Sequence, residues 1–257
     1  MRRAAIVAFS VLALASVTLG IASLAAPGDG RAQGASAPAG GAGDAGRGRS
    51  LFVSGCSSCH GLDARGIPHR GPSLVGVGAQ AADFYLRTGR MPLANPAAQP
   101  QRHPQTDYDD AQVADLIAYV ASLGDGPGVP TPHPERGDLA EGRQLFTESC
   151  AGCHQIMGQG GVVTPGTVAP SLQEATDVQI AEAVRIGPYV MPPFPERQID
   201  DRELDSIVRY VASTRHPDNA GGWGIGNIGP IPEGMVTWFI AVFSLIVVAR
   251  LIGERTA

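Results

Sequence analysis

The sequence predicts an all-α protein with two similar small domains and an apolar segment near each end. Three observations lead to this prediction. One short cysteine motif occurs twice, and the residues around it repeat in the same order. Apolar residues at helical spacing close each repeat, and two apolar runs lie outside the repeats. The net charge of −5 and the lack of a basic block argue against nucleic acid as a partner.

The repeated motif is C-x-x-C-H, at Cys56–His60 and at Cys150–His154. This is the attachment signature of a c-type haem. Cysteines at positions i and i+3 of a helical turn point the same way, so their sulfurs can bond the two vinyl groups of one porphyrin. The histidine that comes next can then reach the iron. We therefore predict two covalently bound c-type haems, held by Cys56, Cys59, Cys150 and Cys153.

The same cysteines have three alternative uses: a disulfide pair, a redox C-x-x-C, or a zinc site formed by all four. A zinc ribbon has similar spacing, but it needs neither a histidine after each pair nor the methionines described below. Each motif also comes after the same lead-in, G-R-x-L-F, at residues 48–52 and 142–146. This repetition favours haem attachment over the alternatives.

The residues after each motif predict the second axial ligand of each iron. Met91 and Met191 each lie before a proline, after a short helical run and ahead of the closing helix. Ligation by methionine and histidine raises the potential of a haem and leaves no open position for oxygen or peroxide. We expect the iron ligands to be His60 with Met91 and His154 with Met191. The alternative for each methionine is a packing role in its loop.

One arginine is a candidate partner for a haem carboxylate. Arg90 immediately precedes Met91. Its planar guanidinium suits a propionate, and the alternative is a solvated charge.

The N-terminal region has two possible roles. Residues 1–26 begin with two arginines after the first Met and continue as an uncharged apolar run. Its length favours a membrane anchor of ~20 residues over the ~7–15 apolar residues of a signal peptide. Small residues around Ser23 leave cleavage open, and in either role this segment exports the domains C-terminal to it. Residues 27–45 are rich in Gly, Ala and Ser and predict a flexible linker.

The repeats predict two domains, at residues 46–125 and 138–217, joined by a Pro-rich linker at 126–137. Each domain should contain the haem motif, a short helix, a methionine loop and a closing helix. The expected short and closing helices are Asp83–Arg87 and Asp109–Gly124 in the first domain, and Ile180–Ile186 and Asp201–Val211 in the second.

A second apolar run predicts a transmembrane helix near the C-terminus. Residues 218–233 form a Gly- and Pro-rich linker, and residues 234–253 are apolar except for Arg250. As a helix this run covers ~30 Å, the thickness of a bilayer core, and Arg250 can reach the interface. Arginines at both chain ends predict cytoplasmic termini, with the haem domains on the extracytoplasmic side of the cell membrane. The protein is multi-pass if residues 1–26 are retained.

These features resemble a known family. Two class I cytochrome c domains in tandem, with apolar segments at both ends, are similar to the dihaem cytochrome c subunit of actinobacterial cytochrome bc1 (bcc) complexes. The resemblance covers nearly the whole chain from about Gly48. It is carried in particular by Gly71–Gly78, Thr88–Pro92 and Gly229–Met235.

The resemblance implies an electron-transfer module of a proton-translocating quinol–cytochrome c reductase. In that family a Rieske iron–sulfur protein passes one electron from a membrane quinol to one haem of this subunit. The electron leaves from the other haem, directly to a terminal oxidase. The implied partners are the cytochrome b subunit, the Rieske subunit and the terminal cytochrome c oxidase, in a membrane supercomplex. No residue of the chain is predicted to be catalytic.

Three other functions compete with this one. The chain could be the dihaem subunit of another membrane oxidase or dehydrogenase, which copurification would distinguish. A dihaem peroxidase would need an open iron site, against which the two methionines argue. A binding module without redox function would lack haem altogether.

Overall fold

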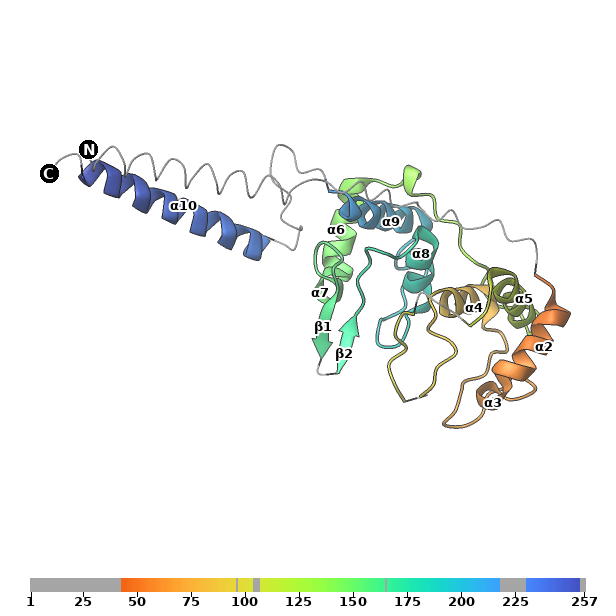
Figure 1. Cartoon of the computed structure of the whole chain (residues 1–257). Helices are drawn as coiled ribbons and strands as arrows, with labels where there is room; N and C mark the ends of the chain where they lie inside the picture. Colours follow the sequence, from red (N-terminus) through yellow and green to blue (C-terminus); the bar gives the residue numbers. More distant parts are fainter. Residues whose placement is uncertain (1–42, 96, 104–106, 165, 218–229, 255–257) are drawn as a thin grey trace. The chain divides into compact units, whose positions relative to one another are not determined.

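The computed structural model describes residues 43–95, 97–103, 107–164, 166–217 and 230–254. The predicted N-terminal segment at 1–26 lies outside the described residues, as do nearly all of the linker at 27–45 and most of the linker at 218–233. The described chain is mostly helical and contains one short β-hairpin (Figure 1).

The first domain is built around a crossing of its first and last helices. Its helices are α2 (Ala45–Gly55), α3 (Ser57–His60), α4 (Gly78–Arg87) and α5 (Asp110–Ala121). A Cβ at Gly48 of α2 would collide with the backbone carbonyl of Asp115 in α5, so only glycine allows this approach. One turn later Phe52 packs on Tyr119, with ring centroids 5.1 Å apart. The crossing buries both rings.

The second domain repeats this crossing. Its helices are η1 (Pro134–Arg136), α6 (Leu139–Ser149), α7 (Ala151–His154), α8 (Asp177–Ile186) and α9 (Asp201–Arg215). A Cβ at Gly142 of α6 would collide with the carbonyl of Ser206 in α9. Phe146 packs on Tyr210 with ring centroids 5.2 Å apart. The predicted pair of similar helical domains is thus confirmed.

Local signals set where the closing helices begin. Asp109 accepts a hydrogen bond from the N–H of Gln112, whose side chain accepts one from the N–H of Asp109. Asp200 and Glu203 form the same reciprocal cap at the start of α9. Such caps satisfy N–H groups that have no partner inside the helix.

Several elements differ from the predictions, and α9 runs to Arg215, beyond the predicted end at Val211. α4 and α8 begin at Gly78 and Asp177, before the predicted starts at Asp83 and Ile180. The start of α8 is set by a capping box made by Thr176 and Gln179, and this cap is not predicted from the sequence. The second domain also contains an antiparallel hairpin, β1 (Gly161–Thr164) and β2 (Thr167–Ala169). Its β-branched residues favour strands.

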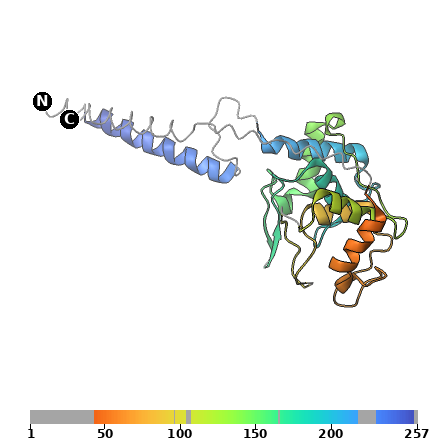
Figure 2. The ribbon, with the colours of Figure 1, turned by 45° about the vertical axis from the view of Figure 1, so that its right-hand side comes forward.

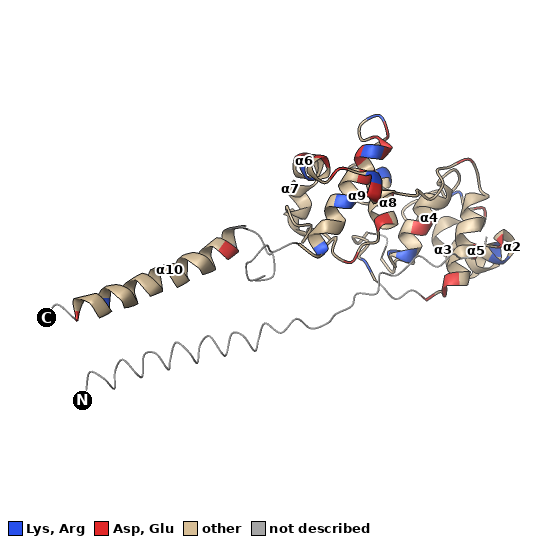
Figure 3. Ribbon diagram, turned by 90° about the horizontal axis from the view of Figure 1, so that it is seen from above, with Lys and Arg blue, Asp and Glu red and all other residues tan. Residues whose placement is uncertain are grey.

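The last described helix is α10 (Pro230–Gly253), seen as one continuous helix in Figure 2. It begins four residues before the predicted span at 234, and proline is tolerated in the first turn because the amide there has no helical partner. Of its residues, Glu233–Gly253 form a stretch of 21 that is long and apolar enough to cross a membrane. Figure 3 shows few charged residues along this helix. It is the one such helix in the described part of the chain.

Candidate haem sites

Each C-x-x-C-H motif occupies one helical turn directly after a longer helix. Cys56 ends α2, and the N–H of His60 donates to the carbonyl of Cys56 over 3.0 Å. The second motif repeats this bond between His154 and Cys150, also at 3.0 Å. This geometry directs both cysteines of a motif to one side of the turn, with the histidine at its end.

A backbone carbonyl orients each histidine. His60 Nδ1 lies 2.8 Å from the carbonyl oxygen of Pro72, and His154 Nδ1 lies 3.1 Å from that of Pro170. A carbonyl oxygen can only accept, so Nδ1 carries the proton and Nε2 keeps a free lone pair. These carbonyl partners are not predicted from the sequence. A Pro-Ser-Leu sequence begins at Pro72 and again at Pro170, and this repeat is the feature of the sequence that could have indicated the two carbonyls.

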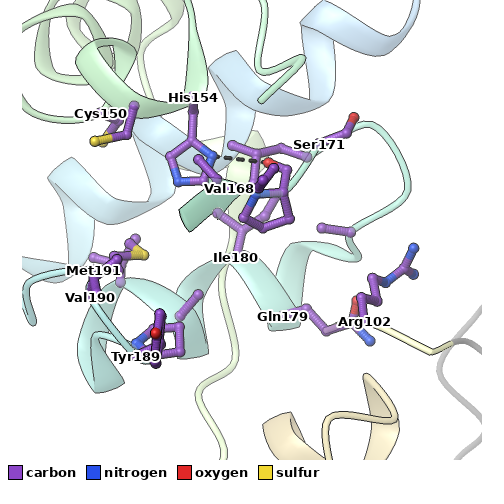
Figure 4. Close-up of a pocket in the computed structure, with 18 of the residues that line it drawn as sticks. Arg102, Cys150, His154, Val168, Ser171, Gln179, Ile180, Tyr189, Val190 and Met191 are labelled. Atoms are coloured by element: carbon purple, nitrogen blue, oxygen red, sulfur yellow. Dashed lines mark hydrogen bonds between the residues drawn. The ribbon is translucent and has the colours of Figure 1, made fainter. Parts of the chain in front are cut away.

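In the second domain the predicted ligands meet at one cavity of about 390 Å³ (Figure 4). Cys150, Cys153, His154 and Met191 all line it. Its walls are largely apolar and include Leu172, Ile180, Val184, Phe194, Ile207 and Val211. Two thiols, an imidazole with a free nitrogen and a thioether, set in apolar walls, fit a c-type haem.

Burial also acts on the titrating groups of this site. It lowers the pKa of His154, against the opposing hydrogen bond to Pro170, and so favours the neutral imidazole that binds iron. Burial, and then the neighbouring Cys153, raises the pKa of Cys150 to about 11. A redox C-x-x-C normally needs a cysteine with a lowered pKa. The environment of Cys150 therefore does not suit a redox thiol. All four cysteines are free in the structure.

The first domain brings two of its four predicted site residues, Cys56 and Met91, to its own apolar cluster. Cys56 and Met91 both pack against the buried group that contains Phe52 and Leu116. His60 is only half-buried, whereas His154 has 8 % of its surface exposed. Tyr119 and Tyr210 of the closing helices pack on Phe52 and Phe146.

The contact between the two domains is not foreseen from the sequence. α4 packs against α8. The side-chain amide of Gln99 pairs with both backbone groups of Val168, at 2.8 and 3.2 Å. Arg102 forms an ion pair with Glu174, 2.5 Å from Nη1 to Oε2. These partners lie 69 and 72 residues apart and carry no common motif, so nothing in the sequence points to them.

Two family models match the chain. "Cytochrome c" matches residues 45–124, and "Cytochrome C oxidase, cbb3-type, subunit III" matches residues 137–211. Both models cover the helical domains described above.

Similar proteins are known in several bacteria. A "Cytochrome bc1 complex cytochrome c subunit" of Corynebacterium diphtheriae is 36% identical over 226 residues, 81% of this chain and 80% of that protein. Its namesake in Mycobacterium tuberculosis is 38% identical over 218 residues, 81% of this chain and 77% of that protein. A "Cbb3-type cytochrome c oxidase subunit CcoP" of Azospirillum sp. is 26% identical over 184 residues, 64% and 60% of the two chains. The chain belongs to the family of cytochrome bc1 complex cytochrome c subunits.

Proposed function

We propose that this chain is the dihaem electron-transfer subunit of a proton-translocating quinol–cytochrome c reductase. It receives electrons from a Rieske iron–sulfur protein and delivers them to a terminal oxidase. The observation that carries the proposal is the second-domain cavity, which two cysteines, a histidine and a methionine line together. The similarity to bc1-complex subunits over 81% of the chain supports the assignment to that complex.

The residues divide the work at each site. Cys56 and Cys59 hold the first haem, and Cys150 and Cys153 the second. When bound, each haem supplies one-electron chemistry at its iron. The ligands are His60 with Met91 and His154 with Met191. The carbonyls behind the histidines fix the ring orientation, and the thioethers keep both potentials high.

The membrane arrangement depends on α10. We propose that this helix anchors the chain, with Arg250 near the cytoplasmic interface and the haem domains on the extracytoplasmic side. The apolar residues at 1–26 add a second span if they are retained. A helix of 21 residues is ~31 Å long, enough for a bilayer core.

Copurification in mild detergent tests the assignment. A tagged full-length chain should bring down a cytochrome b, a Rieske protein and oxidase subunits. The similarity to a cbb3-type oxidase subunit favours one alternative, a subunit of an oxidase alone. Oxidase subunits without cytochrome b or Rieske protein would establish that alternative and overturn the proposal.

A further inference from the structure

Two arginines of the first domain face the cavity of the second. Arg90 comes after α4, and Arg102 lies in the loop beyond Met91. Among the described residues that line the cavity, they are the only Arg, Lys, Asp or Glu. The cavity therefore presents two fixed positive charges and no carboxylate.

Arg90 is a buried cation without an anion. Only 9 % of its surface is exposed, which contradicts the solvated charge considered from the sequence. Its guanidinium carbon lies 4.9 Å from the ring centroid of Phe84, and its side chain has no hydrogen bond or ion pair within the described part of the chain. A buried charge is costly unless an anion compensates it.

Arg102 is held in place by both domains. The N–H of the next residue, His103, donates to the carbonyl of Thr88 at the end of α4, over 3.0 Å. On the other side the guanidinium binds the carboxylate and the backbone carbonyl of Glu174. Its Nε is buried and has no hydrogen-bond partner among the described residues. One donor of this fixed guanidinium therefore remains unused.

The position of Arg102 fits the shape of a haem. Figure 4 shows Arg102 and Cys150 at opposite sides of the cavity, with His154 and Ile180 between them. The vinyl groups that bond to cysteines lie on one half of the porphyrin, and the two propionates lie on the other. The arginines thus border the region where carboxylates of a haem attached at Cys150 would lie.

We propose that Arg90 and Arg102 of the first domain are the cationic partners of the propionates of the haem in the second domain. This inference rests on the proposed function, because it needs a haem attached at Cys150 and Cys153. The first domain then completes the cofactor site of the second. Guanidinium groups pair well with carboxylates. Their positive charge also favours the reduced haem, which carries one more electron.

Redox titration of the full-length dihaem protein in detergent tests the proposal. A Met191→His variant first assigns the component of the second haem, because loss of the thioether lowers that potential. Arg102→Gln should then lower the reduction potential of the second haem. We expect its reduction equilibrium constant to fall about tenfold, which corresponds to 59 mV for one electron. Arg102→Lys should largely restore it. Arg90→Gln should also lower this potential. Arg202→Gln is the control and should not change it, because Arg202 is an exposed residue of α9 outside the cavity.

Glu174→Gln separates a charge effect from a loosened interface. It breaks the same ion pair as Arg102→Gln but removes a negative charge, so it should leave the second potential unchanged or raise it. If both variants lower the potential equally, the arginine acts only on packing and the proposal is overturned. It is also overturned if Arg102→Gln shifts no more than Arg202→Gln. If Met191→His shifts neither component, the second iron site is wrong and the proposed function fails instead.

Discussion

The two domains share one helix crossing but use the loop after the methionine differently. In the second domain this loop folds back on its own core, where Phe194 and Ile199 are buried. Arg185 of α8 holds the loop by donating to both of their carbonyls, at 3.0 and 2.6 Å. In the first domain, no described residue of the loop at 92–103 joins the buried cluster. Its Gln99 and Arg102 contact the second domain instead.

The two domains share the features of their cores but differ in what the loop after the methionine contacts. Both copies retain the glycine crossing, the stacked Phe–Tyr pair and the carbonyl-bound histidine. In the first copy the loop after the methionine contacts the second domain through Gln99 and Arg102. The second site is therefore closed by two domains.

The largest predicted effect is a loss of stability when the buried side chain of Phe194, in the methionine loop of the second domain, is removed. Phe194→Ala empties a buried position and should destabilise the second domain by about 4 kcal/mol. Leu93→Ala, at a half-buried position outside the first core cluster, should cost less than about 1 kcal/mol. Chemical denaturation of the haem-loaded protein measures both. Equal losses would show that both loops support their own domains alike.

The helix crossing should respond equally in both copies. Gly48→Ala and Gly142→Ala each place a methyl group against a backbone carbonyl, which should cost about 3 kcal/mol. Gly128→Ala is the control, because nothing lies within 4 Å of its added Cβ. Thermal unfolding measures these losses. If one of the two substitutions left stability unchanged, the two helix crossings would not be structurally equivalent.

The two methionines should also behave alike, although their loops take different routes. Met91→Ala and Met191→Ala should each lower the potential of one haem by roughly 0.1 V or more and open it to added ligands. Redox titration and visible spectra in the presence of imidazole measure this. An unchanged potential and spectrum in either variant contradicts the ligand assignment for that domain.

The smallest predicted effect concerns a buried carboxyl group where α8 meets α4. Glu182 is fully buried, and within the part of the chain that the structure describes neither carboxyl oxygen has a hydrogen-bond partner. Burial, and then Asp83, raises its pKa to about 9, partly opposed by Arg87. The folded state thus keeps a proton that the unfolded state releases above its ordinary pKa of 4.5. Stability should fall as the pH rises between these values.

Glu182→Gln should remove this pH dependence and stabilise the protein by about 1 kcal/mol at pH 8. Exposed Glu196→Gln is the control. Asp115 of the first domain provides the opposite case, because Arg47 and the N–H of Asp44 lower its pKa. The stability that the ionised Asp115 contributes should be lost as the pH falls below the ordinary pKa of an aspartate. Denaturation curves from pH 5 to 9 that are parallel for Glu182→Gln and the unsubstituted protein would contradict the prediction.

The sequence predicts the parts that local rules specify. The repeated cysteine motif, the apolar spacing of α5 and α9 and the apolar run of α10 are sufficient for the two-domain helical fold and the C-terminal helix. The start of α8 is missed because its cap lies before the apolar periodicity. The contacts of Arg102 could not be predicted, since they depend on how the domains pack. Burial alone distinguishes Arg90 from a solvated arginine.

The number of covalently bound haems per chain is the decisive measurement for the dihaem proposal. Mass spectrometry of the intact mature protein, together with a pyridine haemochrome assay, counts them per chain. We expect two haems per chain, and one when Cys150 and Cys153 are both replaced by serine. A single haem in the unsubstituted protein, or none, would contradict the dihaem proposal.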